Sequence, residues 1–510
     1  RGVGGPWGGV VLVVAGRGVA LQWQDLLLAL LGCFLGTLIG CLPAIGPING
    51  IALLLPIAYT AGLPAESALI LLAAVYYGAE YGGRISSILL NVPGDAGAVM
   101  TAIDGYPLAR AGRATEALAI SGISSFYGGV VAVILTAFLA PLFGLLAIKF
   151  GPAEYFVLMV FAFATLSSMV GHEPVKTLIG CLIGLALTTI GLDATSGAYR
   201  FTFDQSELHD GIEFIVLVIG LFSISEVLLM LEKQTTGTLR PLAVTGNYPS
   251  WATIRDIWWP SMRATAIGFV VGVLPGTGAS VASAVSYTTE KRISDKGDFG
   301  KGSIRGLAAP EAANNAAATG AFVPMLTLGV PGSGTTAVMI GALMLYNIQP
   351  GPQLFTEQPA LVGGLIASMF IGNFILLAMN LPLVKVFVSA LLLPNWILIP
   401  GITILSVLGV YIAYSSILSV FIMLAIGVVG YLLRKLNFDM APIILGFVLG
   451  KVMETNLRNA LALSGGEISI LFQSPLSIAL WIMAAAIIVL PWWSSRRKKK
   501  KSGNASSQAH

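Results

Sequence analysis

The chain has 510 residues, of which 56% are hydrophobic and only 10% are charged, and its mean hydropathy is +0.86. A soluble protein carries about 25% charged residues, so this composition excludes an ordinary soluble protein and indicates a polytopic membrane protein. The formal net charge of +4 comes largely from the run RRKKKK at 496–501, which is typical of a cytoplasmic anchor and not of a nucleic-acid site.

The N-terminal part of the chain is apolar but too short to span a membrane, because glycine interrupts it twice. We expect residues 1–24 to form an N-terminal interfacial segment. Further along, several apolar windows approach the roughly 20 residues that cross a bilayer core. The clearest are 155–170, 212–231, 397–414, 418–433 and 476–493. The predicted fold class is an all-α polytopic membrane protein with about 10–12 transmembrane helices.

The chain contains two similar halves. Pro43 and Pro275 lie 232 positions apart (275 − 43), and Glu80 and Glu311 lie 231 apart (311 − 80). Such drifting offsets are typical of a duplication with small loop insertions. The predicted divisions are the segment 1–24, membrane repeat 1 at 25–231, a cytoplasmic linker at 232–262, membrane repeat 2 at 263–460, an extra transmembrane helix at 473–493 and a basic cytoplasmic tail at 494–510.

The positive charges predict an orientation. If the basic tail is cytoplasmic, successive helices place Lys385, Arg434 and the linker on the cytoplasmic side and the acidic loop 193–210 outside. Helix 212–231 then leads into the cytoplasm, whereas its counterpart 440–453 leads outside. The two halves are therefore predicted to be inverted repeats, the construction of many secondary transporters.

Four segments are predicted to interrupt helices. Proline removes a backbone donor and keeps the preceding residue out of a helix, and glycine permits the turn that follows. Segments 42–56 (LPAIGPINGIALLLP) and 274–287 (LPGTGASVASAVSY) each indicate a helix end, an unwound crossing and a second half-helix. Segments 85–97 and 324–336, which contain NVPGD and GVPGS, indicate re-entrant hairpins. Non-helical backbone at membrane depth requires a protein or aqueous surround, so these interruptions predict a polar site.

The interruptions suit an anion together with a cation. Each second half-helix offers free N–H groups and the positive end of its dipole to an anion, while unwound carbonyls and nearby hydroxyls suit a hard cation such as sodium. Simple kinks, helix caps and interhelical hydrogen bonds remain the alternatives. The candidate substrate-binding residues are Pro43, Gly46, Asn49, Asn91, Pro93, Gly94, Asp95, Gly276, Thr277, Gly278, Ser280, Asn314, Asn315, Pro331, Gly332, Ser333, Gly334, Thr335 and Thr336.

Two acidic residues are candidates for ion coupling. Glu80 and Glu311 are costly inside a membrane, so each is expected either to carry a proton or bind sodium, or else to cap a broken helix. Arg84 follows Glu80 by four residues and therefore either contacts a substrate carboxylate or forms a self-neutralising pair with Glu80. Asp104 and Arg110, in IDGYPLARAGR, are interpreted as part of a solvated loop.

Several long motifs are more specific than any single glycine pattern. They are GCLPAIGPINGIALLLP (40–56), YYGAEYGGRISSILLNVPGDAGAVMTAIDGYPLARAGRATEAL (76–118), RFTFDQSELHDGIEFIVLVIGLFSISE (200–226), GVLPGTGASVASAVSYTTEK (272–291), PEAANNAAATGAFVPMLTLGVPGSGTTAVMIGALM (310–344) and IQPGPQLF (348–355). Through them, roughly residues 20–490 resemble the large membrane subunit of the tripartite tricarboxylate transporter family, the TctA-like permeases. Two positions depart from the family pattern: Ala44 replaces a usual glycine, and Arg84 replaces a usual small residue.

The resemblance implies a secondary active transporter subunit in a bacterial inner membrane, and the basic tail predicts a cytoplasmic C-terminus. The implied partners are a small membrane subunit (TctB-like), a periplasmic solute-binding protein (TctC-like), an organic carboxylate of the di- or tricarboxylate class and the lipid bilayer, with no nucleic acid. The implied mechanism is symport with Na⁺ or H⁺, and we expect no other cofactor, no metal and no catalytic residue. An intramembrane enzyme is the alternative, although the sequence contains no HExxH, GxGD or Ser–His arrangement; an anion channel is a third possibility.

Overall fold

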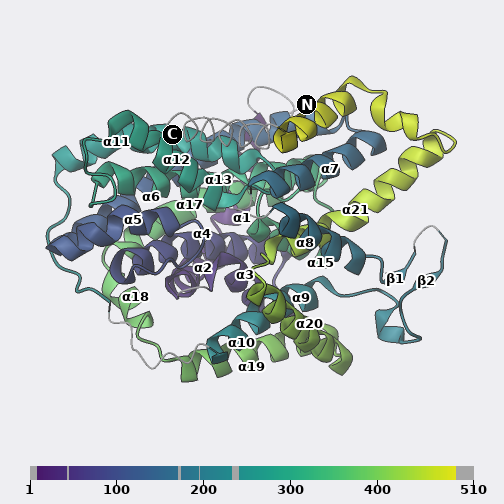
Figure 1. The fold of residues 1–510 in the computed structure, drawn as a ribbon, viewed down its shortest axis with the longest axis horizontal. Coiled ribbons are helices and arrows are strands. Elements are labelled where there is room, and N and C mark those ends of the chain that lie inside the picture. Colours follow the sequence, from purple (N-terminus) through teal and green to yellow (C-terminus); the bar gives the residue numbers. More distant parts are fainter. Residues whose placement is uncertain (1–7, 43–44, 170–173, 194–195, 233–240, 490–510) are drawn as a thin grey trace, which may run out of the picture.

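The computed structural model describes residues 8–42, 45–169, 174–193, 196–232 and 241–489. The described chain is almost entirely helical. Its strands, β1 (Gly191–Leu192) and β2 (Tyr199–Arg200), form one short antiparallel hairpin. Six of the described helical segments are long and apolar enough to cross a membrane, and shorter apolar helices accompany them. The prediction of an all-α polytopic membrane protein is confirmed (Figure 1).

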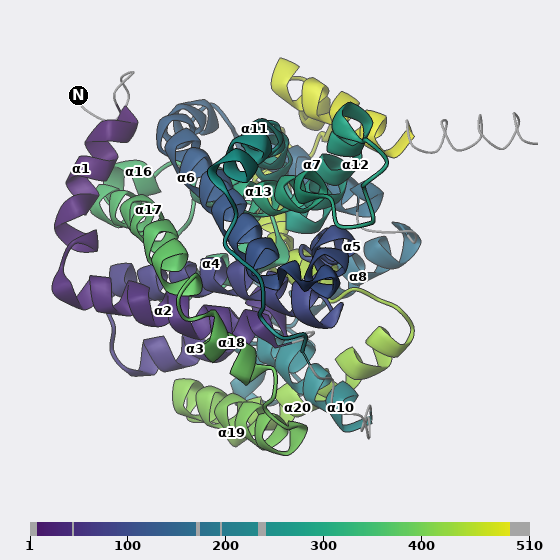
Figure 2. The same cartoon turned by 90° about the vertical axis from the view of Figure 1, so that its left-hand side faces the viewer.

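The first half contains ten α-helices among its described residues. In chain order these are α1 (Gly8–Ala20), α2 (Trp23–Cys41), α3 (Gly46–Thr60), α4 (Ala65–Leu90), α5 (Val99–Leu108), α6 (Ala114–Ala147), α7 (Pro152–Met169), α8 (Pro174–Leu187), α9 (Phe214–Val218) and α10 (Ser225–Glu232). The π-helical segments η1 (Ala109–Arg113) and η3 (Ile219–Ile224) join α5 to α6 and α9 to α10, and a 3₁₀ turn, η2 (Ser206–Leu208), precedes α9. Helix α1, in the segment predicted to be interfacial, packs along α17 and α6, where Gly16 meets Gly363 and Gly9 meets Ala137 (Figure 2).

The second half repeats this order of elements. Its helices are α11 (Trp251–Val273), α12 (Gly278–Ser294), α13 (Ile304–Gly320), α14 (Phe322–Leu328), α15 (Gly334–Leu345), α16 (Leu354–Glu357), α17 (Pro359–Asn380), α18 (Val384–Ala390), α19 (Asn395–Tyr414), α20 (Ile417–Lys435) and α21 (Ala441–Leu463), followed by a 3₁₀ turn η4 (Ile468–Phe472) and a helix over Pro475–Val489. The pair α2–α3 corresponds to α11–α12, α4 to α13 and α14 together, and α7–α8 to α19–α20. This order supports the duplication, and the opposite orientation of the halves stays a prediction.

One boundary differs from the prediction, and another lies outside the described residues. The helix predicted at 440–453 is too short, because α21 continues to Leu463. Its last turns carry Glu454 and Arg458, an i, i+4 ion pair that supports a helix but ends the apolar pattern on which the prediction depended. The last helix is described only to Val489, so the end of the predicted span 473–493 and the tail 494–510 lie outside the described residues.

Glycines let two corresponding pairs of helices touch through their backbones. A Cβ atom on Gly40 of α2 would lie 2.1 Å from the carbonyl oxygen of Ala79 in α4. A Cβ atom on Gly272 of α11 would lie 2.3 Å from the carbonyl oxygen of Ala317 in α13. Small residues at such positions are how membrane helices achieve close van der Waals packing. Close packing therefore holds α4 against α2 and α13 against α11, and α2 and α11 are the helices that precede the first interruption of each half.

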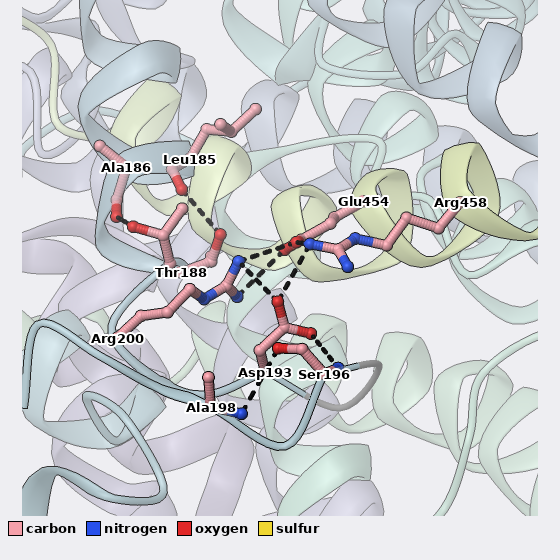
Figure 3. Close-up of polar contacts among 10 residues, drawn as sticks. Leu185, Ala186, Thr188, Asp193, Ser196, Ala198, Arg200, Glu454 and Arg458 are labelled. Carbon is pink, nitrogen blue, oxygen red and sulfur yellow. Dashed lines mark hydrogen bonds and ion pairs between the residues drawn. The ribbon is translucent and has the colours of Figure 1, made fainter.

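Four charged side chains attach the β1–β2 hairpin to α21 (Figure 3). Arg200 donates from Nη1 to Glu454 Oε1 at 2.9 Å and from Nη2 to Oε2 at 3.4 Å. Arg458 donates from Nη2 to Glu454 Oε1 at 2.7 Å and to Asp193 Oδ2 at 3.1 Å. The charge pattern predicted that loop 193–210 and the chain after residue 453 lie on the same side of the membrane. The contact between the hairpin and the end of α21 agrees with this prediction, because residues on opposite sides could not touch.

A second set of ion pairs joins the ends of α10 and α20, which lie with α19 at one end of the molecule, the bottom of Figures 1 and 2. Arg434 Nη1 lies 2.6 Å from Glu226 Oε2, and Lys435 Nζ lies 2.5 Å from Glu232 Oε1. These four residues belong to segments for which the charge pattern predicted the same cytoplasmic side.

Candidate functional site

A cavity of about 730 Å³ brings the four interruptions together. Residues 45–49 and 93–97 line it from the first half of the chain, and residues 276–281 and 333–335 line it from the second. Glu80 and Tyr76 of α4 also contribute to its wall. Segments about 230 residues apart in the sequence therefore meet at one site.

The first interruption begins and ends in the same way in each half. Leu42 after α2 and Leu274 after α11 are both extended, with φ, ψ of −73°, 121° and −74°, 128°. Their N–H groups donate to the carbonyl three residues earlier, at 3.1 Å and 3.0 Å. The next helices, α3 and α12, begin at Gly46 and Gly278, whose positive φ values of 63° and 67° favour glycine. Pro43 lies outside the described residues.

The second interruption also repeats. Helices α4 and α14 are followed by left-handed residues, Asn91 with φ 58° and Gly329 with φ 66°. Four residues later, a side chain caps the turn by accepting the N–H group three residues further on: Asp95 Oδ1 does so at 2.8 Å and Ser333 Oγ at 3.2 Å. Asp95 and Ser333 are 238 positions apart (333 − 95), as are Asn91 and Gly329 (329 − 91).

The prediction that Glu80 and Glu311 are equivalent positions is wrong. The last residues of α4 and α14, Leu90 and Leu328, also lie 238 apart (328 − 90), so Glu311 corresponds to Ala73. The offset of 231 differs from this register by seven residues, about two helical turns. A shift of two turns keeps a residue on nearly the same helix face, which explains why the incorrect pairing looked regular in the sequence.

Glu80 lies at the centre of a cluster of buried oxygens. Its side chain is 4% exposed, and Asn314 Nδ2 of α13 donates to Glu80 Oε2 at 2.8 Å. Asp95 Oδ2 and Asn314 Oδ1 are buried and accept no hydrogen bond from the described residues. A Cβ atom on Gly97 would lie 2.5 Å from Asn314 Oδ1 and 3.2 Å from Asp95 Oδ1. Buried acceptors without donors are rare in folded proteins, and a bound cation or proton would satisfy them.

Hydroxyl groups connect the halves beside this cluster. Tyr76 Oη and Ser333 Oγ lie 3.4 Å apart, and Tyr77 Oη and Thr319 Oγ1 lie 2.7 Å apart. Both tyrosines are buried in α4, whereas their partners come from α15 and α13. Helix α4 is thus held by polar contacts to two helices of the other half.

Glu311 and Arg84 do not line this cavity. The Glu311 carboxylate accepts hydrogen bonds from the Thr101 hydroxyl and, at 2.8 Å, from Ser125 Oγ, so it joins α13 to α5 and α6. Arg84 makes no ion pair with Glu80 among the described residues, contrary to one predicted alternative. Its guanidinium lies 4.3 Å above the ring of Tyr81 and lines a different cavity.

The predicted binding residues fall into two groups. Those at the cavity wall are Gly46, Asn49, Pro93, Gly94, Asp95, Gly276, Thr277, Gly278, Ser280, Ser333, Gly334 and Thr335. Those placed behind the wall or beside it are Asn91, Asn314, Asn315, Pro331, Gly332 and Thr336. Asn314 nevertheless reaches the site through its hydrogen bond to Glu80. Of the two ion-coupling candidates, only Glu80 lines the cavity.

Sequence reasoning missed a cation at the cavity. In the sequence, Arg434, at the end of α20, serves only to predict the orientation of the chain. In the structure Arg434 lines the cavity and donates from Nη1 to Glu226 Oε2. Its Nε is buried without a partner. The turn that follows, 438–442, lines the cavity as well. The sequence feature that could have identified Arg434 is its position directly before a short turn between two apolar helices.

The interpretation of Asp104 as part of a solvated loop is wrong. Asp104 lies in α5 and is 0% exposed. Its Oδ1 accepts hydrogen bonds from the N–H groups of Gly300, Gly302 and Ser303 at 2.8 to 2.9 Å, and its Oδ2 accepts from Tyr287 Oη at 2.9 Å. It therefore organises the loop that leads into α13.

Known proteins give a consistent set of matches. The family described as the tripartite tricarboxylate transporter TctA family matches residues 26–445. An uncharacterized 52.8 kDa protein in the TAR-I ttuC' 3' region of Agrobacterium vitis is 40% identical over 468 residues, covering 92% of this chain and 93% of that protein. An uncharacterized protein in the TAR-II ttuC' 3' region of Agrobacterium vitis is 42% identical over 214 residues, covering 42% of this chain and 88% of that protein. No solved structure matches.

Proposed function

Because the chain belongs to the tripartite tricarboxylate transporter TctA family, we propose that it is the membrane subunit that imports an organic carboxylate of the di- or tricarboxylate class. The observation that carries this proposal is the meeting of all four interruptions at one cavity of about 730 Å³. Helices α3, α12 and α15 begin at its wall, and unpaired N–H groups with the positive dipole end favour carboxylates at such helix starts. Arg434, which is paired with Glu226, adds a guanidinium to the same wall.

We propose that uptake is coupled to Na⁺ or H⁺ at the Glu80 cluster. The donor-free oxygens of Asp95 and Asn314 are hard ligands suited to Na⁺. The Glu80 carboxylate, buried beside them, is suited to carry a proton. Either ion would offset the acidic charge at a cavity that must also accept an anion. Among the described residues, no group of three or more His, Cys, Asp or Glu side chains is placed to hold a metal, so a multidentate carboxylate site is not part of this proposal.

The proposed assembly contains two further proteins. A periplasmic solute-binding protein would deliver the carboxylate, and a small membrane subunit would complete the transporter in the inner membrane, with the C-terminus in the cytoplasm. Membership of the transporter family supports this assembly and argues against an enzyme. Duplicated halves that meet at one site suit alternating access, in which one set of helices moves relative to the other around the bound substrate.

Reconstitution tests both substrate and coupling. The chain would be placed in proteoliposomes with its two partner subunits, and accumulation of radiolabelled di- and tricarboxylates would be measured under an inward Na⁺ gradient alone and an inward H⁺ gradient alone. We expect accumulation above the external concentration with one of the gradients. Equilibration without accumulation would instead identify a channel, and chemical conversion without accumulation would identify an enzyme. A matched Glu80→Gln variant would lose the gradient dependence.

A further inference from the structure

A second cavity, of about 390 Å³, lies beside Arg84 and shares no lining residue with the substrate cavity. Its wall combines α4, the start of α6, linker residues 244–248 and the segment 380–385 after α17. Backbone hydrogen bonds hold the linker here, from Leu242 N–H to Leu89 O and from Thr115 N–H to Thr245 O, both at 3.0 Å. The cavity therefore lies where the connection between the two halves meets helix α4.

Arg84 is a buried cation without an anionic contact. It is 2% exposed and makes no hydrogen bond or ion pair among the described residues, and its Nε and Nη1 are buried without partners. The ring of Tyr81 lies on one side of the guanidinium, and a Cβ atom on Gly122 would stand 3.0 Å from Nη1. Glu311 acts on Arg84 electrostatically, but its oxygens already accept hydrogen bonds from hydroxyl groups. An unpaired buried guanidinium is costly, which indicates that an anion completes this site.

Two other polar groups line the same cavity. Lys385 is exposed and, within the described part of the chain, has no hydrogen bond or ion pair. Asn380 is 4% exposed; its Nδ2 donates to Leu376 O at 3.0 Å, which leaves its Oδ1 without a donor. None of the described residues that line the cavity is acidic. The cavity thus offers two positive charges and one unpaired acceptor.

We propose that this second cavity binds a phosphate group, either as free phosphate or as the headgroup of a phospholipid. A guanidinium presents a planar fork of donors that fits phosphate oxygens, and the lysine ammonium adds a point charge. A phosphate or phosphomonoester oxygen that keeps its proton can donate to Asn380 Oδ1, whereas an ionised carboxylate has no donor to offer. Binding would tie the linker and segment 380–385 to α4, the helix that carries Glu80 one turn before Arg84.

Direct binding measurements on the detergent-purified full chain test this proposal. Titration with inorganic phosphate, against chloride at equal ionic strength, would give the affinity for the free anion. We expect Arg84→Gln to weaken binding at least about tenfold, because the variant lacks the charge-assisted hydrogen bonds from the guanidinium to the phosphate oxygens. Lys385→Gln should weaken it less, and Lys296→Gln, an exposed lysine outside the cavity, should not change it. Ser333→Ala, in the substrate cavity, should also leave phosphate affinity unchanged.

A lipid arm distinguishes the two sources. The purified protein and its variants would be placed in nanodiscs containing either phosphatidic acid or only phosphatidylcholine, and bound lipid would be identified by native mass spectrometry. Retention of phosphatidic acid by the wild type but not by Arg84→Gln would assign the site to a lipid. If Arg84→Gln fails to fold, Arg84→Lys, which keeps the charge but lacks the fork, and Lys385→Gln carry the test. The proposal would be overturned if the wild type and the folded variants bound phosphate and phosphatidic acid equally well. It would also be overturned if a dicarboxylate displaced phosphate at a tenfold lower concentration.

Discussion

Asn314 Nδ2 of the second half donates a 2.8 Å hydrogen bond to Glu80 Oε2 of the first half. Replacing Asn314 by Ala leaves this buried carboxylate without its donor, and a hydrogen bond to a charged group contributes about 1.5–3 kcal/mol. We therefore expect the initial rate of carboxylate uptake into proteoliposomes to fall at least about tenfold. Asn373→Ala is the matched control, because Asn373 is similarly buried, but among the described residues its side chain bonds only to Met369 O within α17. Equal uptake by the two variants would remove Asn314 from the site.

Gly97 is expected to tolerate no side chain. A Cβ atom there would lie 2.5 Å from Asn314 Oδ1, so Gly97→Ala must displace the amide that holds Glu80. We expect uptake to be lost while the protein still inserts and purifies as the wild type does. Gly401→Ala in α19 adds the same methyl group where no atom of the described residues lies within 4 Å, apart from its chain neighbours and its own helix backbone, and it should transport normally. Normal uptake by Gly97→Ala would show that the Asn314 amide can move without consequence.

Ser333 is expected to matter beyond its role as a helix cap. Its hydroxyl caps α15 at 3.2 Å from Thr336 N and faces the substrate cavity. Ser250 caps α11 at the same distance, 3.2 Å from Thr253 N, but lies outside that cavity. Alanine at either position should cost about 1 kcal/mol of stability. In uptake assays, only Ser333→Ala should lose transport; similar uptake by both variants would reduce Ser333 to a cap.

The ion pairs of α21 predict a response to acid. The Arg200 side chain, which bonds to Glu454, lowers the pKa of Glu454 below its usual value, and Arg458 adds to this effect. A folded pKa below the unfolded one gives stability that is present above the unfolded pKa and is lost as the pH falls through the folded pKa. The Tm of the detergent-purified protein should therefore fall less steeply below about pH 4 in Glu454→Gln than in the wild type, since the unfolded pKa is about 4.3.

The control for this experiment is a glutamate without such partners. The side chain of Glu357, exposed at the end of α16, makes no hydrogen bond or ion pair among the described residues. Glu357→Gln should retain the wild-type dependence of Tm on pH. Parallel curves for wild type and Glu454→Gln would mean that the Arg200–Glu454 contact contributes nothing to stability, as is common for exposed ion pairs.

The interruptions were predictable because proline and glycine act on the backbone next to them. Pro275 and Gly278 together, three residues apart, favour a break through their own backbones, so the sequence alone located the end of α11 and the start of α12. Apolar windows located α19 and α20 for a similar reason, since about 20 apolar residues suffice to indicate a span. Such local signals give the order of elements and the approximate position of the cavity wall.

Contacts between distant segments could not be predicted in this way. Asp104 looks solvated in its own stretch of sequence, because three of its donors come from residues 300–303, almost 200 positions later. The register of α4 against α13 and α14 was also misassigned, since a shift of two turns preserves the helical pattern. Only the three-dimensional arrangement shows that Arg434 turns toward the cavity and that Arg84 lines a different one.

The backbone contacts at Gly40 and Gly272 have a mechanical consequence. Where Gly40 meets Ala79 and Gly272 meets Ala317, no side chain separates the two backbones, so a slip of one residue would bring a Cβ atom against the opposing main chain and is expected to be unfavourable. Each of these helix pairs, α2 with α4 and α11 with α13, is therefore expected to move as one rigid unit. Under the alternating access proposed above, we expect movement between these helix pairs to be taken up next to the cavity, at Leu42 and at the turn 274–277, where the described chain leaves helical form.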